Sequence, residues 1–237
     1  MLIYINDKNM AKNKINKHPL IVILVGPPGS GKGTQADLLR KKFKLELIGS
    51  GDLLRARKKI KDFTGKKIAQ TIDGGKRVPT PIIFNLWMEK MESFAQKPNF
   101  RGLIMDGSPR TKMEADMLEL VLDWYGWQSN KKVIFLDDIA PKKLIWRLTR
   151  RRVCSGCNRN IPYLGAMKDL KACDRCGGKL VTRADDNPQG VKERLGWYKR
   201  DVMPAIDFYR RKKELIEIDG DQPIEKVFSD ILKAIGK

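Results

Sequence analysis

A glycine-rich segment near the start of the chain has the residue types and the spacing of a phosphate-binding loop. The segment GPPGSGKGT, residues 26–34, matches the pattern G-x-x-x-x-G-K and directly follows the apolar run LIVILV at 20–25. Glycines allow backbone N–H groups to turn toward phosphate oxygens, and a helix that begins near Lys32 would add its partial positive charge. The predicted phosphate ligands are Gly29, Ser30, Gly31, Lys32, Gly33 and Thr34.

Four cysteines form a second candidate site. They are arranged as two C-x-x-C pairs, Cys154 with Cys157 and Cys173 with Cys176. Two such pairs are typical of a closed tetrahedral site in which four thiolates hold Zn²⁺ and leave no open position for catalysis, so we predict a structural zinc. Two disulfides are the alternative, which a reducing cytosol disfavours. Zinc-ribbon modules that bind nucleic acid share this spacing.

The remaining reactive side chains favour charge neutralisation over acid–base chemistry. His18 is the one histidine and has no partner at motif spacing, so we interpret it as a bystander. Arginines bracket the phosphate loop, and Arg147 and Arg151 lie one helical turn apart, so both can point into one cleft. Phosphoryl transfer to a monophosphate requires alignment and charge neutralisation but no general base, because the attacking phosphate oxygen is already anionic.

Size and composition indicate one main α/β domain with a polyanionic ligand or partner. The chain has 237 residues, with 48 Lys and Arg against 28 Asp and Glu and a net charge of +20. The charges are scattered, so they are weak evidence for nucleic-acid binding. The chain contains no apolar run of about 18 residues, and its first residues lack the apolar centre of a signal peptide. We therefore expect a cytosolic protein with no membrane partner, and a monomer.

Alternating strand and helix patterns surround these residues. Continuous apolar runs predict five buried parallel strands at 20–25, 45–48, 102–107, 132–138 and 214–220. Helical spacing predicts two buried faces, one formed by Ile83, Leu86, Trp87 and Met91, the other by Met113, Met117, Leu120, Val121 and Trp124. The prediction is a three-layer, doubly wound α/β fold of the P-loop type around a five-stranded parallel sheet.

Three segments depart from this alternation and suggest the domain organisation. Residues 1–19 form a basic, polar tail in which Met10 could be the true start. Residues 20–237 form the P-loop domain, with its core at 20–48, 80–150 and 187–237. Two insertions interrupt the core, a basic segment at 49–79 and the cysteine-containing segment at 151–186.

Several separated motifs resemble the nucleoside monophosphate kinases, and the adenylate kinases in particular. The loop variant GPPGSGKGTQ has Gly33 where many P-loop hydrolases place a Mg²⁺-binding Ser or Thr. The similarity extends from Ile21 to the end of the chain through IGSGDLLR, GGKRVP, GLIMDGSPRT, WRLTRRRVC, TRADDNP and DGDQP. It implies that 49–79 binds the acceptor monophosphate and that 151–186 is a mobile lid, in some members of the family held by four cysteines.

The resemblance also implies residue roles. The acceptor, AMP, would contact Ser50, Arg55, Lys76, Arg77, Val78, Gly107, Arg110, Glu114, Arg183 and Arg194. The donor, ATP, would contact the phosphate loop together with Arg147, Arg151 and Gln222. Asp106 would lie near the Mg²⁺ that accompanies ATP. The catalytic set would be Lys32, Asp106, Arg110, Arg147, Arg151, Arg183 and Arg194.

Two positions differ from the family pattern on the acceptor side. Ser108 replaces a phenylalanine, and Glu114 replaces the glutamine that contacts the acceptor base. An ionised carboxylate only accepts hydrogen bonds, so it would face the N1 lone pair of adenine but could accept two donors from guanine. Glu114 alone therefore favours GMP, whereas the other motifs favour AMP.

We predict a Mg²⁺-dependent kinase that converts ATP and AMP to two ADP by in-line transfer under a closing lid. Three alternatives remain open at this stage. The first is a kinase that prefers another monophosphate such as GMP, and the second is a nucleic-acid-associated protein that uses the zinc ribbon and the basic charge. The third is a simple ATPase, which would release phosphate without an acceptor.

Overall fold

The computed structural model describes residues 18–74 and 76–237 of the chain. Residues 1–17 lie outside this description. They include most of the predicted basic tail and the predicted start at Met10. No helix in the described part of the chain combines the length and the apolar content that crossing a bilayer requires.

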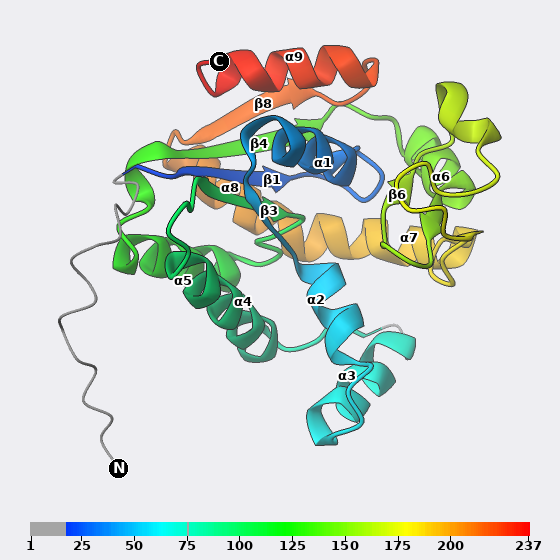
Figure 1. Ribbon diagram of the computed structural model, residues 1–237, viewed down its shortest axis with the longest axis horizontal. Helices are drawn as coiled ribbons and strands as arrows, with labels where there is room; N and C mark the ends of the chain where they lie inside the picture. The colour runs from blue at the N-terminus through cyan, green and yellow to red at the C-terminus, as the bar shows by residue number, and fades with distance from the viewer. Residues whose placement is uncertain (1–17, 75) are drawn as a thin grey trace.

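A five-stranded parallel sheet forms the centre of the molecule (Figure 1). Its strand order is β2-β3-β1-β4-β8, and all five predicted strands are present. In the edge strand β8 only Ile218 is buried. The strands are β1 (Leu20–Val25), β2 (Glu46–Gly49), β3 (Gly102–Asp106), β4 (Lys131–Asp137) and β8 (Leu215–Asp219). Because all five are parallel, their carboxyl ends meet at one edge, where ligands of open α/β sheets bind.

Helices cover both faces of the sheet and complete three layers. Alternate residues of β1 point to opposite faces, Ile21 and Ile23 toward one buried cluster and Val22 and Leu24 toward the other. The first face packs against α4 (Thr80–Ala95), α5 (Lys112–Trp124) and α8 (Met203–Arg211), and the second against α1 (Lys32–Phe43) and α9 (Ile224–Ala234). Figure 1 shows α9 on the opposite side of the sheet from α4 and α5.

The buried face predicted for residues 113–124 is wrong for most of its members. Met113, Leu120 and Trp124 are 59%, 72% and 81% exposed, and Val121 is the one predicted residue that is buried. The helix instead buries the neighbouring stripe Glu114, Ala115, Leu118, Val121 and Leu122. Both stripes satisfy helical spacing, and packing against α4 and α8 selects the second.

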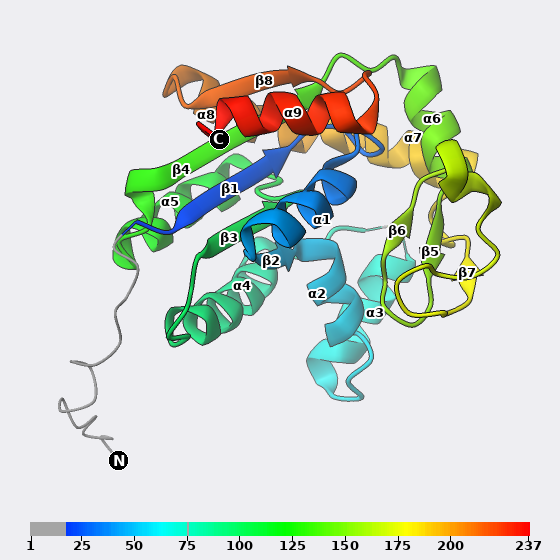
Figure 2. The ribbon, with the colours of Figure 1, turned by 45° about the horizontal axis from the view of Figure 1, so that its top comes forward.

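Two insertions extend from the carboxyl edge of the sheet (Figure 2). The first contains α2 (Ser50–Arg57) and α3 (Phe63–Asp73) between β2 and α4. The second follows α6 (Pro141–Arg150) and contains a small antiparallel sheet of order β6-β5-β7. Its elements are β5 (Arg152–Cys154), β6 (Asn160–Ile161), η3 (Gly165–Asp169) and β7 (Leu180–Val181).

The chain returns from the second insertion to the core through one long helical segment. It comprises α7 (Pro188–Trp197), the π-helical turn η4 (Tyr198–Val202) and α8. Asn187 caps α7 by accepting a hydrogen bond from the backbone N–H of Gly190 at 2.9 Å. A short 3-10 helix, η2 (Gln128–Asn130), precedes β4, and its Ser129 Oγ lies 2.8 Å from His18 Nδ1.

Candidate active site

One cavity of about 900 Å³ lies between the carboxyl edge of the sheet and the two insertions. Every residue that the sequence predicted to contact ATP or AMP lines it. These residues come from loops that follow β1, β3 and β8, from helices α1, α2, α5, α6 and α7, from the segment before α4 and from the end of the second insertion. The structure thus brings the predicted set together, while the role of each residue remains a prediction.

The glycines of the phosphate loop are required by its backbone. Gly26 has φ 144°, and a Cβ at this position would lie 2.3 Å from the carbonyl oxygen of Leu136 on β4. Gly31 has φ 96° at the N-cap of α1, with open space where a side chain would extend. The first turn of α1 contains no acidic residue that would offset the partial positive charge of the helix start. That charge is therefore free to attract phosphate.

Lys32 folds back onto its own loop. Its Nζ donates to the carbonyl oxygens of Gly26 at 2.9 Å and Pro27 at 2.7 Å, and to Ser30 Oγ at 3.2 Å. Burial lowers the pKa of Lys32 to about 8, against the attraction of Asp106. Burial likewise raises the pKa of Asp106, opposed by Lys32. A bound polyphosphate would supply the negative charge that this lysine lacks.

Three arginines, one from each end of the second insertion and one from α7, converge on two adjacent carboxylates. The Asp186 carboxylate is fully buried and accepts from Arg151 Nε at 2.9 Å, from its NH2 at 2.7 Å, and from Arg194 NH1 at 2.8 Å. Asp185, which is half exposed, pairs with Arg183 at 2.8 Å and with Arg194 at 3.1 Å. The sequence analysis assigned no role to either aspartate, although two consecutive acids in a basic segment are visible in TRADDNP.

Arg147 and Gln222 line the cavity at the loop after β8. Arg147 donates to the carbonyl oxygen of Gly220 at 3.1 Å and to Asp221 Oδ1 at 3.0 Å. Gln222 Nε2 donates to the carbonyl oxygen of Asp219 at 3.0 Å. These contacts join the loop to α6, so the backbone of this region forms a continuous wall of the cavity.

Polar side chains are buried beside the first insertion. Trp87 Nε1 donates to Ser50 Oγ at 2.9 Å, and Ser50 Oγ is hydrogen-bonded to Ser108 Oγ. The hydroxyls of Ser50 and Ser108 are both buried, so each serves as a hydrogen-bond partner for the other. Arg110 Nε donates to the carbonyl oxygen of Gly107 at 2.9 Å, and Arg55 pairs with Asp52 at 2.6 Å.

Glu114 is buried at the cavity wall and holds the start of α5. Its backbone N–H donates to Thr111 Oγ1 at 3.0 Å, and its Oε2 accepts from the backbone N–H of Arg110 at 2.6 Å. This reciprocal arrangement is similar to a capping box. The other oxygen, Oε1, lies 3.5 Å from Arg77 NH2. Burial raises the pKa of Glu114, opposed by the hydrogen bond from Arg110 and by the charges of Arg110 and Arg77.

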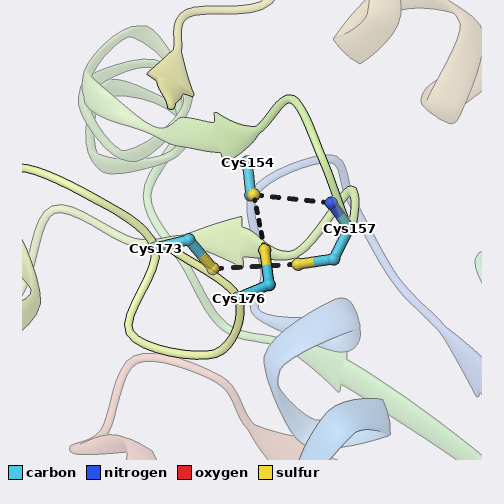
Figure 3. Close-up of side chains that lie close together, drawn as sticks. All are labelled: Cys154, Cys157, Cys173 and Cys176. Atoms are coloured by element: carbon cyan, nitrogen blue, oxygen red, sulfur yellow. Dashed lines mark hydrogen bonds between the residues drawn. The ribbon is translucent and has the colours of Figure 1, made fainter. Parts of the chain in front are cut away.

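The four cysteines form a cluster that can hold a metal ion (Figure 3). Their sulfur atoms all lie within 4.8 Å of one another, with 3.4 Å between Cys154 and Cys176 and 3.7 Å between Cys157 and Cys173. A tetrahedral ion with metal–sulfur bonds of about 2.3 Å requires sulfur atoms about 3.8 Å apart, so the cluster fits. The structure has no disulfide among these four cysteines, and the cluster is compatible with a metal site.

Basic side chains of the second insertion support the insertion itself. The Arg152 guanidinium donates to the carbonyl oxygens of Met167 at 2.7 Å and Lys168 at 2.8 Å. Arg159 pairs with Asp174. Asn160 on β6 reaches the phosphate loop, since its Nδ2 would lie 3.0 Å from a Cβ placed on Gly33. This amide was absent from the predicted site because only the folded insertion brings it there.

Comparison with known proteins identifies related sequences over most of the chain. The family model described as adenylate kinase matches residues 24–214. An adenylate kinase of Methanocella arvoryzae is 36% identical over 220 residues, covering 91% of this chain and 98% of the relative. One of Desulfitobacterium hafniense is 36% identical over 214 residues, covering 90% and 96%. One of Chlamydia trachomatis serovar L2 is 34% identical over 231 residues, covering 93% and 92%.

Proposed function

The chain belongs to the adenylate kinase family and is a nucleoside monophosphate kinase that phosphorylates AMP, and we propose that the described cavity carries out the transfer. The observation that supports this proposal is the convergence of the phosphate loop and the arginines of six separate segments on one cavity. Such a site neutralises phosphate charge from several directions and contains no histidine, as expected for transfer between two phosphates.

On the donor side, the phosphate loop would hold the β- and γ-phosphates of ATP. Backbone N–H groups of Gly29 to Thr34 and the start of α1 would contact the phosphate oxygens, and Lys32 would leave its loop carbonyls for the outer phosphates. Arg147 and the backbone near Gln222 would bind the nucleoside.

On the acceptor side, Arg55 and Arg110 would hold the phosphate of AMP. The base would enter the space bounded by Ser50, Val78 and Glu114, next to the backbone of Lys76 to Val78. Arg151, Arg183 and Arg194 would stabilise the negative charge on the transferring group. Closure of the second insertion would exclude water, which otherwise competes with AMP for the phosphoryl group.

Residues near the phosphate loop fit the Mg²⁺ that accompanies ATP in adenylate kinases. The carboxylate of Asp106 adjoins the start of α1, where its Oδ2 would lie 3.3 Å from a Cβ on Gly33, and Thr34 offers a hydroxyl at the same edge of the cavity. Such an ion neutralises phosphate charge when bound. Asp106 would orient it through oxygen ligands or through bound water.

We propose Zn²⁺ for the four-cysteine site. The backbone N–H of Cys157 lies 3.4 Å from Cys154 Sγ, a contact that favours the thiolate that zinc requires. The insertion has few buried apolar residues, such as Ile161, so a closed metal site would keep it rigid while it moves as a lid. A monomeric state and a cytosolic location remain predictions.

An acceptor panel tests the proposal. The purified protein is mixed with Mg·ATP and each of AMP, GMP, CMP and UMP, and ADP formation is followed with a coupled assay. AMP should give the highest kcat/KM, and phosphate release from ATP alone should be much slower. A preference for GMP, or acceptor-independent phosphate release, would contradict it.

A further inference from the structure

Apolar side chains line the cavity together with a pair of opposite charges. Leu54, Ile72, Val78 and Ile83 line the cavity, and all but Ile72 are buried. Arg77 and Glu114 line it as well, with Arg77 NH2 3.5 Å from Glu114 Oε1. A planar base could pack against the apolar side chains and meet both charged groups at its edge. On the proposed function, that base is the adenine of AMP.

The carboxylate of Glu114 has one oxygen engaged in the fold and one directed toward Arg77. Oε2 accepts the short hydrogen bond from the Arg110 backbone, so the position of the carboxylate is fixed by the start of α5. At 3.5 Å the contact between Oε1 and Arg77 is an ion pair without a hydrogen bond. Oε1 therefore retains a lone pair for a donor on the base.

Arg77 is held in place from its other side. Its NH1 lies 3.0 Å from Asp201 Oδ2, and Asp201 belongs to the π-helical turn η4, which adjoins the cavity. π-Helical turns inside α-helices are frequent at functional sites. With NH1 engaged by Asp201, NH2 is the nitrogen that lies near Glu114. The structure thus places a fixed donor beside a fixed acceptor.

We propose that Arg77 and Glu114 together recognise the Watson–Crick edge of the acceptor adenine. Arg77 NH2 donates to N1, and Glu114 Oε1 accepts from the exocyclic amine. The pair thereby provides the adjacent donor and acceptor that a single amide side chain would provide. A carboxylate alone would oppose the N1 lone pair, and Arg77 removes that conflict. Guanine carries N–H at N1, so in this orientation it would face the donor of Arg77 and be disfavoured.

Variants can separate recognition of the base from support of the fold. Arg77→Leu should raise KM for AMP about 10- to 100-fold, the range expected for loss of a base-specific contact, with KM for ATP unchanged. Glu114→Gln should also raise KM for AMP, because its one oxygen must accept from the Arg110 backbone and its NH2 group then faces the exocyclic amine as a donor. The double variant should lose less than the two single losses combined, because both side chains bind one edge of the base. Lys66→Leu removes an exposed charge from the same insertion, away from the cavity, and should change neither KM.

A substrate analogue tests the same contact from the other side. Replacing N1 of AMP by C–H, as in 1-deaza-AMP, should weaken the wild-type enzyme but cause no further loss in Arg77→Leu. The proposal is overturned if the two single losses add fully in the double variant, because the two side chains would then act independently. It is also overturned if the loss with 1-deaza-AMP is the same in both proteins. Turnover of AMP by the wild type is measured in parallel, so failure of the proposed function would appear there.

Discussion

Replacing Asp186 by asparagine should destabilise the protein far more than the same change at Asp185. Asp186 is fully buried and holds Arg151 through three hydrogen bonds and Arg194 through one. Asn has nearly the same shape but no charge, so the guanidinium of Arg151 would lose its carboxylate partner. Breaking a buried pair by removing one partner costs about 3–5 kcal/mol. Arg194 retains Asp185 at 3.1 Å, so we expect a value near the lower limit, about 3 kcal/mol.

Urea unfolding followed by tryptophan fluorescence measures this loss. A change of about 3 kcal/mol corresponds to a decrease of about 1 M or more in the urea midpoint. Asp185→Asn is the matched control, because its side chain is 45% exposed and its loss should cost less than about 1 kcal/mol. Turnover of Asp186→Asn should also fall by about 100-fold, since Arg151 would no longer be oriented toward the phosphates. Equal losses of stability in Asp186→Asn and Asp185→Asn would contradict the burial of the Asp186 carboxylate.

Three further predictions follow from the same structure. The purified protein should contain about one zinc per chain. Cys157→Ser should lose the metal, and its second insertion should become sensitive to proteolysis. A metal-free Cys157→Ser protein whose second insertion still resists proteolysis would contradict this. Binding of ATP at pH 8.5 should take up protons, because burial lowers the pKa of Lys32 to about 8 and bound phosphate favours the charged form of Lys32. Calorimetry in two buffers should show this proton uptake, and Lys32→Met should abolish it. Burial raises the pKa of Glu114, so the stability that its neutral form contributes is lost as pH rises through the folded pKa. Glu114→Gln should therefore raise Tm more at pH 7 than at pH 4. A difference in Tm that does not change with pH would contradict this.

Local sequence signals predicted the sheet and the phosphate loop because each depends on neighbouring residues. The run at 20–25 is apolar at every position, as a strand covered on both faces requires, and the loop that follows needs glycine at Gly26 and Gly31 for its backbone. The cysteine spacing was equally local. These features can be recognised without knowing what packs against them.

The features that the sequence did not predict depend on contacts between distant segments. In α5, Leu118 and Leu120 are both apolar, and only packing against α4 and α8 shows that Leu118 is the buried one. The contact of Arg151 with Asp186 joins the two ends of the second insertion. Arg77 was predicted at the acceptor site, but its position between Glu114 and Asp201 requires the first insertion to meet η4. Spacing along the chain contains no signal for such pairs.

A single-turnover experiment with ATP labelled at the γ-phosphate tests the central claim most directly. Enzyme in excess over labelled Mg·ATP is quenched after milliseconds to seconds, with and without AMP, and the label is separated into ATP, ADP and inorganic phosphate. Transfer to AMP predicts that the label appears in ADP as ATP is consumed, and that little phosphate forms when AMP is absent. Release of labelled phosphate at the same rate with and without AMP would contradict the account.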